Sequence, residues 1–495
     1  EEFVAGNYAK KILYVHHQLN ELKKFEQFAK KLSMYQSTDK EIQKIINKFF
    51  ITVDKYPVVK EKFTKFIKNL ITDLIDFLRS ERFMIILIFF KVLEKDTEED
   101  MEILDTLSFL KTKQESLVIV KKVDSNKYQY EEEDTDAVFD NLVCQEIIKN
   151  RVNTRLEPNR MMDFFNETLN SEVTDMFSNL ESTYQVNTTD INYEVLDNLE
   201  WIMNELLVVF DHLHKFCWVK FPLREMYFNV YYKHLNSLIM NIINKEPDFN
   251  NLVKILQLDQ IFLNFFNKDL KFKALNWESP SIIGEKEKNS LIDDYLNLLN
   301  KKMDEWVYNI QKEETSLFIK RDKEPIFDEN KKLWILDLKN LFQMFIQQMD
   351  LCCDIGYIEI FLGCFNIFTK LILKRQRDWI DLVKSELKKW IDYNHYTNNS
   401  DHYDDRHKVE QPAGGFLEYL IAVTNDQMKG ADLTVMIQDK YTQLVSNKHK
   451  QTIDAEIDLI LDGYADVAKV CTNAIIDLIT DDVNDNLALV LSSKW

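Results

Sequence analysis

Glycine and proline, the residues that break helices and build tight turns, are rare in this sequence. The chain has 8 Gly and 7 Pro among 495 residues, whereas the two together usually make up roughly 12% of a protein. A β-sandwich or a doubly wound sheet needs many tight turns, and those turns need Gly and Pro. Helices tolerate their absence. The sequence therefore predicts an almost wholly α-helical protein.

The length of the chain exceeds what a single hydrophobic core usually organises. Two stretches interrupt the helical pattern, namely the acidic Asp124–Asp136 and the loop Asn276–Glu285. We therefore expect three helical bundles, at 1–123, 137–275 and 286–495, joined end to end as an elongated rod of consecutive antiparallel bundles. The third bundle is expected to be incomplete, because the helical pattern persists up to its end.

Three stretches carry more specific expectations. Phe83–Val92 is apolar on all sides and is expected to be buried, with a further helix beginning near Asp96. Asn330–Asp354 has a helical pattern throughout. Tyr393–Gln411 is polar and lacks a pattern, which predicts a long surface loop.

Gly414–Asp432 gives the clearest helix signal in the chain. Its apolar residues recur at helical spacing, which predicts one face packed against neighbouring helices. That predicted packing face comprises Leu417, Leu420, Ile421, Thr424 and Met428. The face predicted to meet solvent comprises Glu418, Asn425, Asp426, Gln427 and Lys429.

The charge balance argues against nucleic acid and lipid as direct ligands. The chain has 62 basic and 82 acidic residues, a net charge of −20, which repels phosphate backbones and anionic lipid heads. We expect no nucleic-acid partner and only indirect contact with a membrane. The basic cluster Lys370, Lys374, Arg375 and Arg377 is interpreted as the solvated last turn of a helix.

Motifs for phosphate, metal and nucleophile chemistry are absent from the sequence. The positions of the Gly residues exclude GxGxxG and Walker A loops, and no His is followed directly by Glu as in HExxH. An acidic stretch that starts at Asp482 lacks the Gly and Glu of a calcium-binding EF-hand loop. We therefore expect no catalytic, cofactor-binding or metal-binding residue and no cofactor, and the sequence does not identify partner-binding residues.

Histidine-rich combinations are interpreted as surface or capping residues. Asp precedes His by three residues at Asp211/His214, Asp392/His395 and Asp404/His407, which is expected by chance in so acidic a chain. A loop cluster of possible zinc ligands, in a polar stretch that argues against a fixed tetrahedron, comprises His395, His402, Asp404, Asp405 and His407. His212, His214 and Cys217 would not converge if they lay on one helix, so these two His are interpreted as core and rim residues.

Cysteine and tryptophan are interpreted as core residues. The six Cys show no CxxC spacing, which is typical of small apolar residues in a reducing compartment and indicates a cytoplasmic protein. The longest apolar run, Phe83–Phe90, is much shorter than the ~20 residues of a membrane span. Four Trp fall on apolar stripes of predicted helices and are expected to pack in the core: Trp201, Trp306, Trp379 and Trp390.

Several helical stretches resemble the Sec-six family of exocyst subunits. They are Tyr193–Val208, Lys286–Trp306, Lys374–Tyr393 and Gly414–Asp432, followed by Leu461–Val470 and the turn with Arg155, Pro158 and Arg160. The resemblance is good from about residue 150 onward and vague before it. It implies a rod of stacked helical bundles without enzyme activity. It also implies that the family's N-terminal coiled-coil arm and last helical bundle are missing here.

The resemblance further implies what the protein does and where. A subunit of this family belongs to a hetero-oligomer that tethers secretory vesicles to the plasma membrane before SNARE-mediated fusion. The implied partners are other exocyst subunits, plasma-membrane SNAREs and their Sec-one/Munc-eighteen-type regulator. The implied location is the cytoplasm, with recruitment to plasma-membrane sites of polarised secretion. Two alternatives stay open: a helical scaffold of another trafficking or cytoskeletal complex, and, with least support, a helical-bundle metal enzyme.

Overall fold

The computed structural model describes residues 5–34, 40–125, 155, 157–268, 278–329, 331–336, 338–398 and 410–490. The chain divides into two compact units, Glu1–Glu246 (unit 1) and Pro247–Trp495 (unit 2). Nearly all described residues of both units are helical, which confirms the predicted all-α class. The finer division into three bundles and their arrangement as an elongated rod stay predictions.

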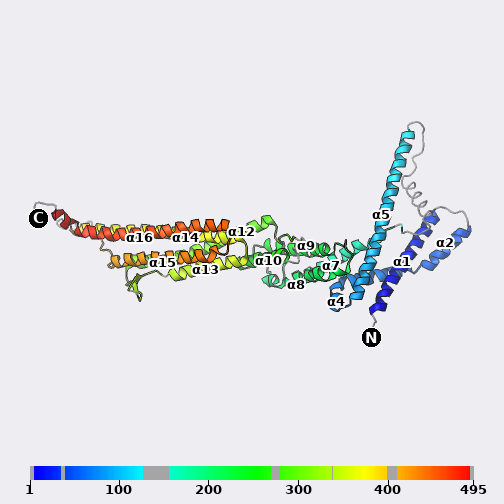
Figure 1. The fold of residues 1–495 in the computed structure, drawn as a ribbon, viewed down its shortest axis with the longest axis horizontal. Helices are drawn as coiled ribbons and strands as arrows, with labels where there is room; N and C mark the ends of the chain where they lie inside the picture. The colour runs from blue at the N-terminus through cyan, green and yellow to red at the C-terminus, as the bar shows by residue number, and fades with distance from the viewer. Residues whose placement is uncertain are drawn as a thin grey trace. The chain divides into compact units, whose positions relative to one another are not determined.

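Unit 1 is α-helical, and α1 and α5 are the longest of its described helices (Figure 1). Its elements are α1 (Ala5–Met34), α2 (Lys40–Val53), α3 (Tyr56–Thr72), α4 (Leu74–Arg79), α5 (Phe83–Ser125), α7 (Met161–Thr183), η1 (Tyr193–Asn198), α8 (Glu200–Asp211), η2 (Leu213–Phe216) and α9 (Leu223–Ile243). Helix α1 lies along α5, and α7 packs on α3, α5 and α9.

Helix α5 differs from the expectation of a wholly buried segment followed by a second helix. It is one helix of 43 residues, because no Gly or Pro interrupts it. Ile86, Phe89 and other residues of one face are buried, whereas Phe83 and Leu87 are 44% and 47% exposed. The expectation that Phe83–Val92 is buried on all sides is therefore wrong: the helix turns one side to solvent although that side is apolar.

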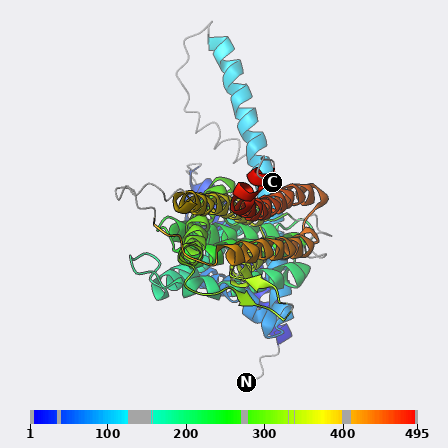
Figure 2. The ribbon, with the colours of Figure 1, turned by 90° about the vertical axis from the view of Figure 1, so that its left-hand side faces the viewer.

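Unit 2 is a bundle whose helices alternate in direction along the chain (Figure 1). Its elements are α10 (Phe249–Lys268), α12 (Glu285–Lys320), β1 (Ile326–Phe327), β2 (Leu333–Trp334), α13 (Leu338–Ile355), α14 (Ile358–Asn398), α15 (Phe416–Thr442) and α16 (Asn447–Val490). Figure 2 shows this bundle from the end at which α16 finishes. None of the helices in the described part of the chain is long and apolar enough to cross a membrane.

Cross-helix hydrogen bonds fix the directions of the last three helices, α14, α15 and α16. Asn366 and Asn394 of α14 donate to Glu456 and Asp481 of α16, at 3.1 Å and 3.2 Å. Both partners advance along the chain together, so α14 and α16 run parallel. Helix α15 runs antiparallel to α16. Gln438, near the end of α15, donates to Asp454, near the start of α16, at 2.7 Å. The earlier residue Gly430 of α15 lies beside the later residue Tyr464 of α16.

A short hairpin replaces the first part of the helix expected at Asn330–Asp354. Strands β1 and β2 pair antiparallel, with Ile326 opposite Trp334. The turn is closed by the Asp328 carboxylate, which accepts from the backbone N–H of Lys332 at 2.8 Å. The hairpin contains the only strands in the described part of unit 2, and it packs on α15.

Helix α14 continues further than the sequence suggested. It reaches Asn398, so the first part of the surface loop expected at Tyr393–Gln411 is helical, and residues 399–409 lie outside the described residues. The basic cluster around Lys374 therefore lies in the middle of a helix and not in its last turn. Arg375 is 2% exposed and pairs with Glu314 of α12, so it is a core residue. The interpretation of a solvated helix end is wrong.

Helix α15 packs with a different face from the one predicted. Leu417, Ile421 and Met428 are 43%, 38% and 62% exposed, whereas Asp426 and Gln427 are buried. The predicted assignment of faces is wrong for these residues. The buried face shares only Leu420 with the predicted packing face, and it comprises Phe416, Tyr419, Leu420, Ala422, Val423, Asp426, Gln427, Gly430, Thr434, Ile437 and Tyr441.

Gly430 shows why this buried face includes small and polar residues. A Cβ atom at Gly430 would lie 2.8 Å from the ring of Tyr464 on α16. Only a residue without a side chain lets the two helices approach this closely. Gly430 is therefore a packing position inside α15, whereas Leu417, Ile421 and Met428 are exposed.

Candidate functional site

The histidine and cysteine residues singled out above do not gather into one site. His395 Nε2 lies 3.5 Å from Asp481 of α16, while His402, Asp404, Asp405 and His407 lie outside the described residues. Helix α8 ends at Asp211, so His214 and Cys217 lie on a short 3₁₀ turn and beyond it, not on a common helix. Within the described residues, no three His, Cys, Asp or Glu side chains are close enough to share a metal ion.

The core interpretation of Cys and Trp is partly confirmed. Cys352, Cys364 and Cys471 are fully buried, and Trp379 is 1% exposed. Trp201, Trp306 and Trp390 are half-buried at the edges of their bundles. These residues therefore serve packing and not a common pocket.

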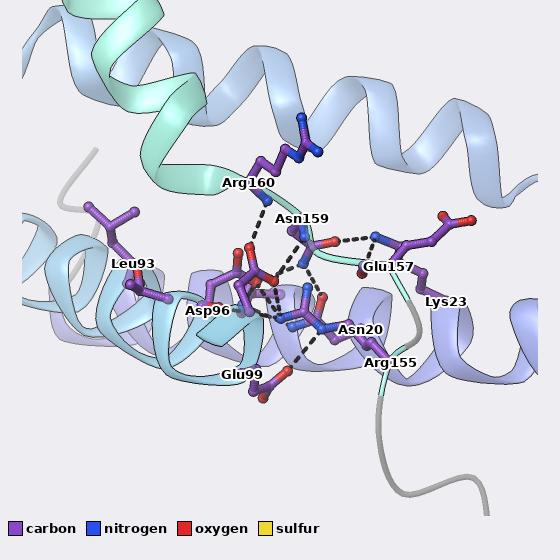
Figure 3. A network of polar contacts seen from close by, with 12 residues as sticks. Asn20, Lys23, Leu93, Asp96, Glu99, Arg155, Glu157, Asn159 and Arg160 are labelled. Atoms are coloured by element: carbon purple, nitrogen blue, oxygen red, sulfur yellow. Dashed lines mark hydrogen bonds and ion pairs between the residues drawn. The ribbon is translucent and has the colours of Figure 1, made fainter. Parts of the chain in front are cut away.

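A buried polar network in unit 1 is centred on Arg155 (Figure 3). Glu99 and Asp100 follow Asp96 by three and four residues on α5, a spacing that places all three on one helix face. The Arg155 guanidinium lies 3.3 Å from Asp96 and 3.0 Å from Asp100, and its Nε donates to Glu99 at 3.0 Å. The side chains of Arg155 and Asp96 are both 0% exposed. The guanidinium thus neutralises carboxylates that burial would otherwise destabilise.

The chain that follows Arg155 is fastened to the same helix. The Asp100 carboxylate accepts from the backbone N–H groups of Asn159 and Arg160, at 2.9 Å and 2.7 Å. Arg160 has a φ of 55°, a left-handed conformation that is costly for a residue with a side chain. These two hydrogen bonds hold that conformation immediately before α7 begins.

Helix α1 joins the network through two polar side chains (Figure 3). Lys23 donates to Asn159 Oδ1 at 2.6 Å and to the carbonyl of Glu157 at 3.2 Å. The Asn159 amide donates to Asn20 of α1 at 3.0 Å and to Asp96 of α5 at 2.7 Å. Asn159 therefore bridges α1 and α5, so this network connects three helices of unit 1.

Burial sets the ionisation of the groups in the network. It raises the pKa of Asp96, while Arg155 and the Asn159 amide oppose the rise. Burial is also the main cause that lowers the pKa of His16 to about 4, and Arg155 lowers it further. His16 is therefore neutral at pH 7. These ionisation states suit a permanent structural connection, because each charge has a partner that stabilises it.

In the described part of unit 2, two buried ion pairs connect separate segments. Arg375 of α14 pairs with Glu314 of α12, and Arg321 pairs with Glu386 of α14 at 3.0 Å. Arg321 also donates to the carbonyl of Ala413 at 2.9 Å, which anchors the chain just before α15. Each pair links two separate parts of the bundle.

Asp426 connects the hairpin to α15. Its carboxylate accepts from the backbone N–H groups of Ile335 and Leu336, both at 3.0 Å. Burial raises the pKa of Asp426 to about 7, although these hydrogen bonds lower it. Asp259 has a similar role elsewhere in unit 2, where it accepts from Ser281 Oγ at 2.9 Å and from Tyr357.

A hollow of about 400 Å³ lies between α12 and α14. Two cross-helix contacts border it: Lys374 pairs with Asp304 at 3.0 Å, and Gln311 donates to Asp378 at 3.0 Å. These two contacts connect α12 to α14 through polar side chains, as the buried ion pairs do. The sequence could not reveal these pairings, because the partners lie tens of residues apart and the chain offers 82 acidic residues.

Comparison with known proteins identifies the family. The family model described as exocyst complex component Sec6 matches residues 53–495. Exocyst complex component SEC6 of Saccharomyces cerevisiae is 32% identical over 495 residues, which cover 98% of this chain and 60% of that protein. Exocyst complex component sec6 of Schizosaccharomyces pombe is 20% identical over 298 residues, which cover 60% of this chain and 38% of that protein. The chain thus spans about three fifths of the length of its Saccharomyces relative.

A solved structure shows that the fold is shared more widely. The crystal structure of M-Sec is similar with a TM-score of 0.55 at 10% identity, over 98% of this chain and 66% of that one. The sequence resemblance noted above is confirmed, and the family model extends it to residue 53, into the part of the chain where the resemblance was vague. The match over nearly all of the chain shows that this protein belongs to the Sec6 family of exocyst complex components.

Proposed function

We propose that this chain is a non-catalytic exocyst subunit that helps to tether secretory vesicles to the plasma membrane before SNARE-mediated fusion. The observation that carries the proposal is the family match over residues 53–495. Its direct partners are other exocyst subunits in a hetero-oligomer. Plasma-membrane SNAREs and their Sec-one/Munc-eighteen-type regulator are further partners. The protein acts from the cytoplasm at plasma-membrane sites of polarised secretion.

The buried polar groups support a structural role and not catalysis. Arg155, Arg321 and Arg375 each pair with carboxylates inside a bundle, and Asp426 is taken up by backbone N–H groups. General acid–base chemistry needs such groups to reach a substrate. Side chains that already hold helices together are unsuited to that task. The outer faces of the helices are then the surfaces that do the work.

The net charge of −20 suggests how these surfaces attract partners. An acidic protein associates fastest with basic faces, and salt screens that attraction. Raising the salt concentration is therefore expected to weaken partner binding without unfolding the helical bundles. Unchanged affinity across a salt series would remove the electrostatic part of the proposal.

Affinity purification of the tagged chain from its own cells tests the function. Other exocyst subunits are expected among the enriched proteins, with SNAREs recovered under mild salt. An unrelated acidic helical protein with the same tag is the control. Enrichment of motors, cargo receptors or another trafficking complex instead would support the scaffold alternative. Stoichiometric zinc or iron in the purified protein would support the metal enzyme.

A further inference from the structure

The basic residues of this acidic chain are unevenly distributed. The first 72 residues contain 14 Lys and 8 acidic residues, a net charge of +6, whereas the remaining 423 residues contain 48 basic and 74 acidic residues. Within residues 40–72, which form α2, α3 and the turn between them, eight Lys face Glu41, Asp54 and Glu61 as the only acidic residues. All eight are exposed, namely Lys40, Lys44, Lys48, Lys55, Lys60, Lys62, Lys65 and Lys68. The net charge of the whole chain therefore does not describe the surface of these two helices.

Helices α2 and α3 pack on other helices of unit 1. Helix α2 lies beside α1 (Figure 1), and the ring centroid of its Phe49 is 6.5 Å from that of Phe25. Helix α3 packs on α1 and α7, and the ring centroid of its Phe63 is 6.2 Å from that of His16 on α1. The chain from α2 to α3 thus runs back along α1, and each helix keeps its other side for solvent.

The solvent side of α2 mixes Lys with aliphatic side chains. Ile45 and Ile51 are 68% and 77% exposed. Because residues turn by about 100° around a helix, these two side chains lie about 120° apart. Lys44 and Lys48 lie between them, and the buried Ile46 lies on the opposite side of the helix. Cations and aliphatic groups therefore share one outer arc of α2.

Helix α3 repeats this arrangement. Val58 and Val59, which are 53% and 47% exposed, lie about 100° apart with Lys62 between them. Lys65 follows Val58 by seven residues and lies on the same face, while the buried Ile71 lies opposite. We call the outer residues of the two helices the α2–α3 ridge; it comprises Lys44, Ile45, Lys48, Ile51, Val58, Val59, Lys62 and Lys65.

The mixture of side chains favours a lipid bilayer over a partner helix as the occupant of the ridge. A partner helix needs an apolar seam, and a Lys in the middle of that seam would lose its water. At a bilayer, aliphatic side chains enter the acyl boundary while long Lys side chains reach the headgroups. Clusters of about four to eight Lys or Arg on an amphipathic helix typically bind anionic lipids. Acidic groups farther away than a Debye length, about 8 Å at physiological salt, are largely screened.

We propose that the α2–α3 ridge binds the surface of an anionic lipid bilayer, with its Lys at the headgroups and its Ile and Val at the acyl boundary. The inference goes beyond the proposed function, which needs no direct lipid contact by this chain. It also differs from the expectation of indirect membrane contact, because that expectation used the net charge of the whole chain and not its distribution.

Flotation of the purified 495-residue chain with vesicles tests the proposal. The probe is a vesicle of phosphatidylcholine with about 30% phosphatidylserine, an anionic lipid, and the control vesicle is phosphatidylcholine alone. The chain is expected to float with the anionic vesicle and not with the neutral one. Raising the salt concentration from about 0.1 M to about 1 M is expected to weaken binding, because it shortens the Debye length.

A pair of double variants tests the role of the Lys side chains. Lys44→Gln combined with Lys62→Gln removes two charges from the ridge. Each Lys near an anionic surface strengthens binding roughly fivefold, so the double variant is expected to bind about 25-fold more weakly. The matched control combines Lys384→Gln with Lys388→Gln, two exposed Lys of α14. It is expected to bind within about twofold of the unaltered chain.

A pair of single variants tests the role of the aliphatic side chains. Ile51→Gln removes an aliphatic group from the ridge and is expected to weaken binding about tenfold. Ile479→Gln is the matched control, because Ile479 of α16 is also exposed, at 56%. No loss of binding is expected for it. All the variants replace exposed residues, and circular dichroism verifies that they fold.

Three results would each overturn the proposal. The first is equal binding to neutral and anionic vesicles, or binding to neither. The second is a loss of binding in the control variants as large as in the ridge variants, or no loss in the ridge variants. The third is a fluorescent Glu-rich amphipathic peptide that binds the chain more tightly than the vesicles do and that requires Lys44 and Lys62, because an acidic protein would then be the occupant.

Discussion

Replacement of Arg155 by Ala tests the network that connects the helices of unit 1. The substitution removes the guanidinium that lies 3.3 Å from Asp96 and 3.0 Å from Asp100. It leaves Asp96, which is 0% exposed, without a cation beside it. Glu99 is 42% exposed and can be solvated by water, so loss of its ion pair with Arg155 contributes little to the change in stability.

The expected loss follows from these exposures. Removing one partner of a fully buried ion pair costs about 3–5 kcal/mol. For a unit of this size, 1 kcal/mol shifts the melting temperature by about 2–4 °C. Arg155→Ala is therefore expected to lower the melting temperature of unit 1 by roughly 10 °C, within a range of about 6–20 °C.

Differential scanning calorimetry of the whole chain, with unit 1 and unit 2 resolved as separate transitions, measures the effect. Arg79→Ala is the matched control, because Arg79 is 53% exposed in its pairs with Asp76 and Glu205. An exposed pair contributes only about 0–1 kcal/mol. Arg155→Lys keeps the charge but not the forked geometry, and an intermediate loss is expected.

The pH dependence of the variant supplies a second readout. Burial already raises the pKa of Asp96, and loss of Arg155 removes the main opposing cause. The folded state of the variant then holds its proton more tightly than the unfolded state does. Its deficit is therefore expected to shrink as the pH falls from 7 towards 5. A deficit no larger than that of Arg79→Ala, or one that grows in acid, would refute this account of the network.

Three further predictions concern unit 2. Asp426→Asn keeps one acceptor oxygen for the two backbone N–H groups, which both donate to Asp426 Oδ2, but it removes a buried carboxylate. Burial raises the pKa of Asp426 to about 7. The variant is expected to gain more stability over the unaltered chain at pH 8 than at pH 5. At pH 5 the Asp426 carboxyl of the unaltered chain is protonated, which already removes the cost of burying its charge. Equal gains in thermal unfolding at both pH values would contradict this. Gly430→Ala is expected to destabilise by about 1–3 kcal/mol in urea unfolding, since the new Cβ meets the Tyr464 ring at 2.8 Å; a stabilised variant would show that helix propensity outweighs packing there. Arg375→Met alone is expected to lower the free energy of unfolding by about 3–5 kcal/mol, because it leaves the buried Glu314 carboxylate without its cation. The double variant with Glu314→Leu is expected to lose clearly less. Additive losses in the same unfolding assay would contradict the pairing.

The fold class was predictable from the sequence, whereas the faces of the helices were not. The scarcity of Gly and Pro leads directly to helices, and nearly all described residues are helical. Helix α15 shows the limit of such reasoning. Leu417, Ile421 and Met428 form the more regular apolar stripe, yet the buried face contains Asp426 and Gly430.

The reason lies in tertiary contacts that no local pattern reports. Asp426 is buried because two backbone N–H groups of the β2 segment need an acceptor, and Gly430 because α16 comes close. Likewise, the sequence singles out Arg155 only as part of a turn that resembles the Sec-six family. Its role follows from carboxylates on α5, 55 to 59 residues earlier in the chain. In so acidic a chain, the sequence alone does not identify which carboxylate pairs with a given basic residue.

The central claim is that this chain works through the outer faces of helices whose interiors are fastened by buried polar groups. Hydrogen–deuterium exchange of the chain, alone and after addition of other exocyst subunits, tests this claim most directly. The account predicts new protection in peptides that carry exposed helix faces, with unchanged slow exchange around Arg155, Arg375 and Asp426. Protection confined to the interior, or no change when the subunits are added, would contradict it.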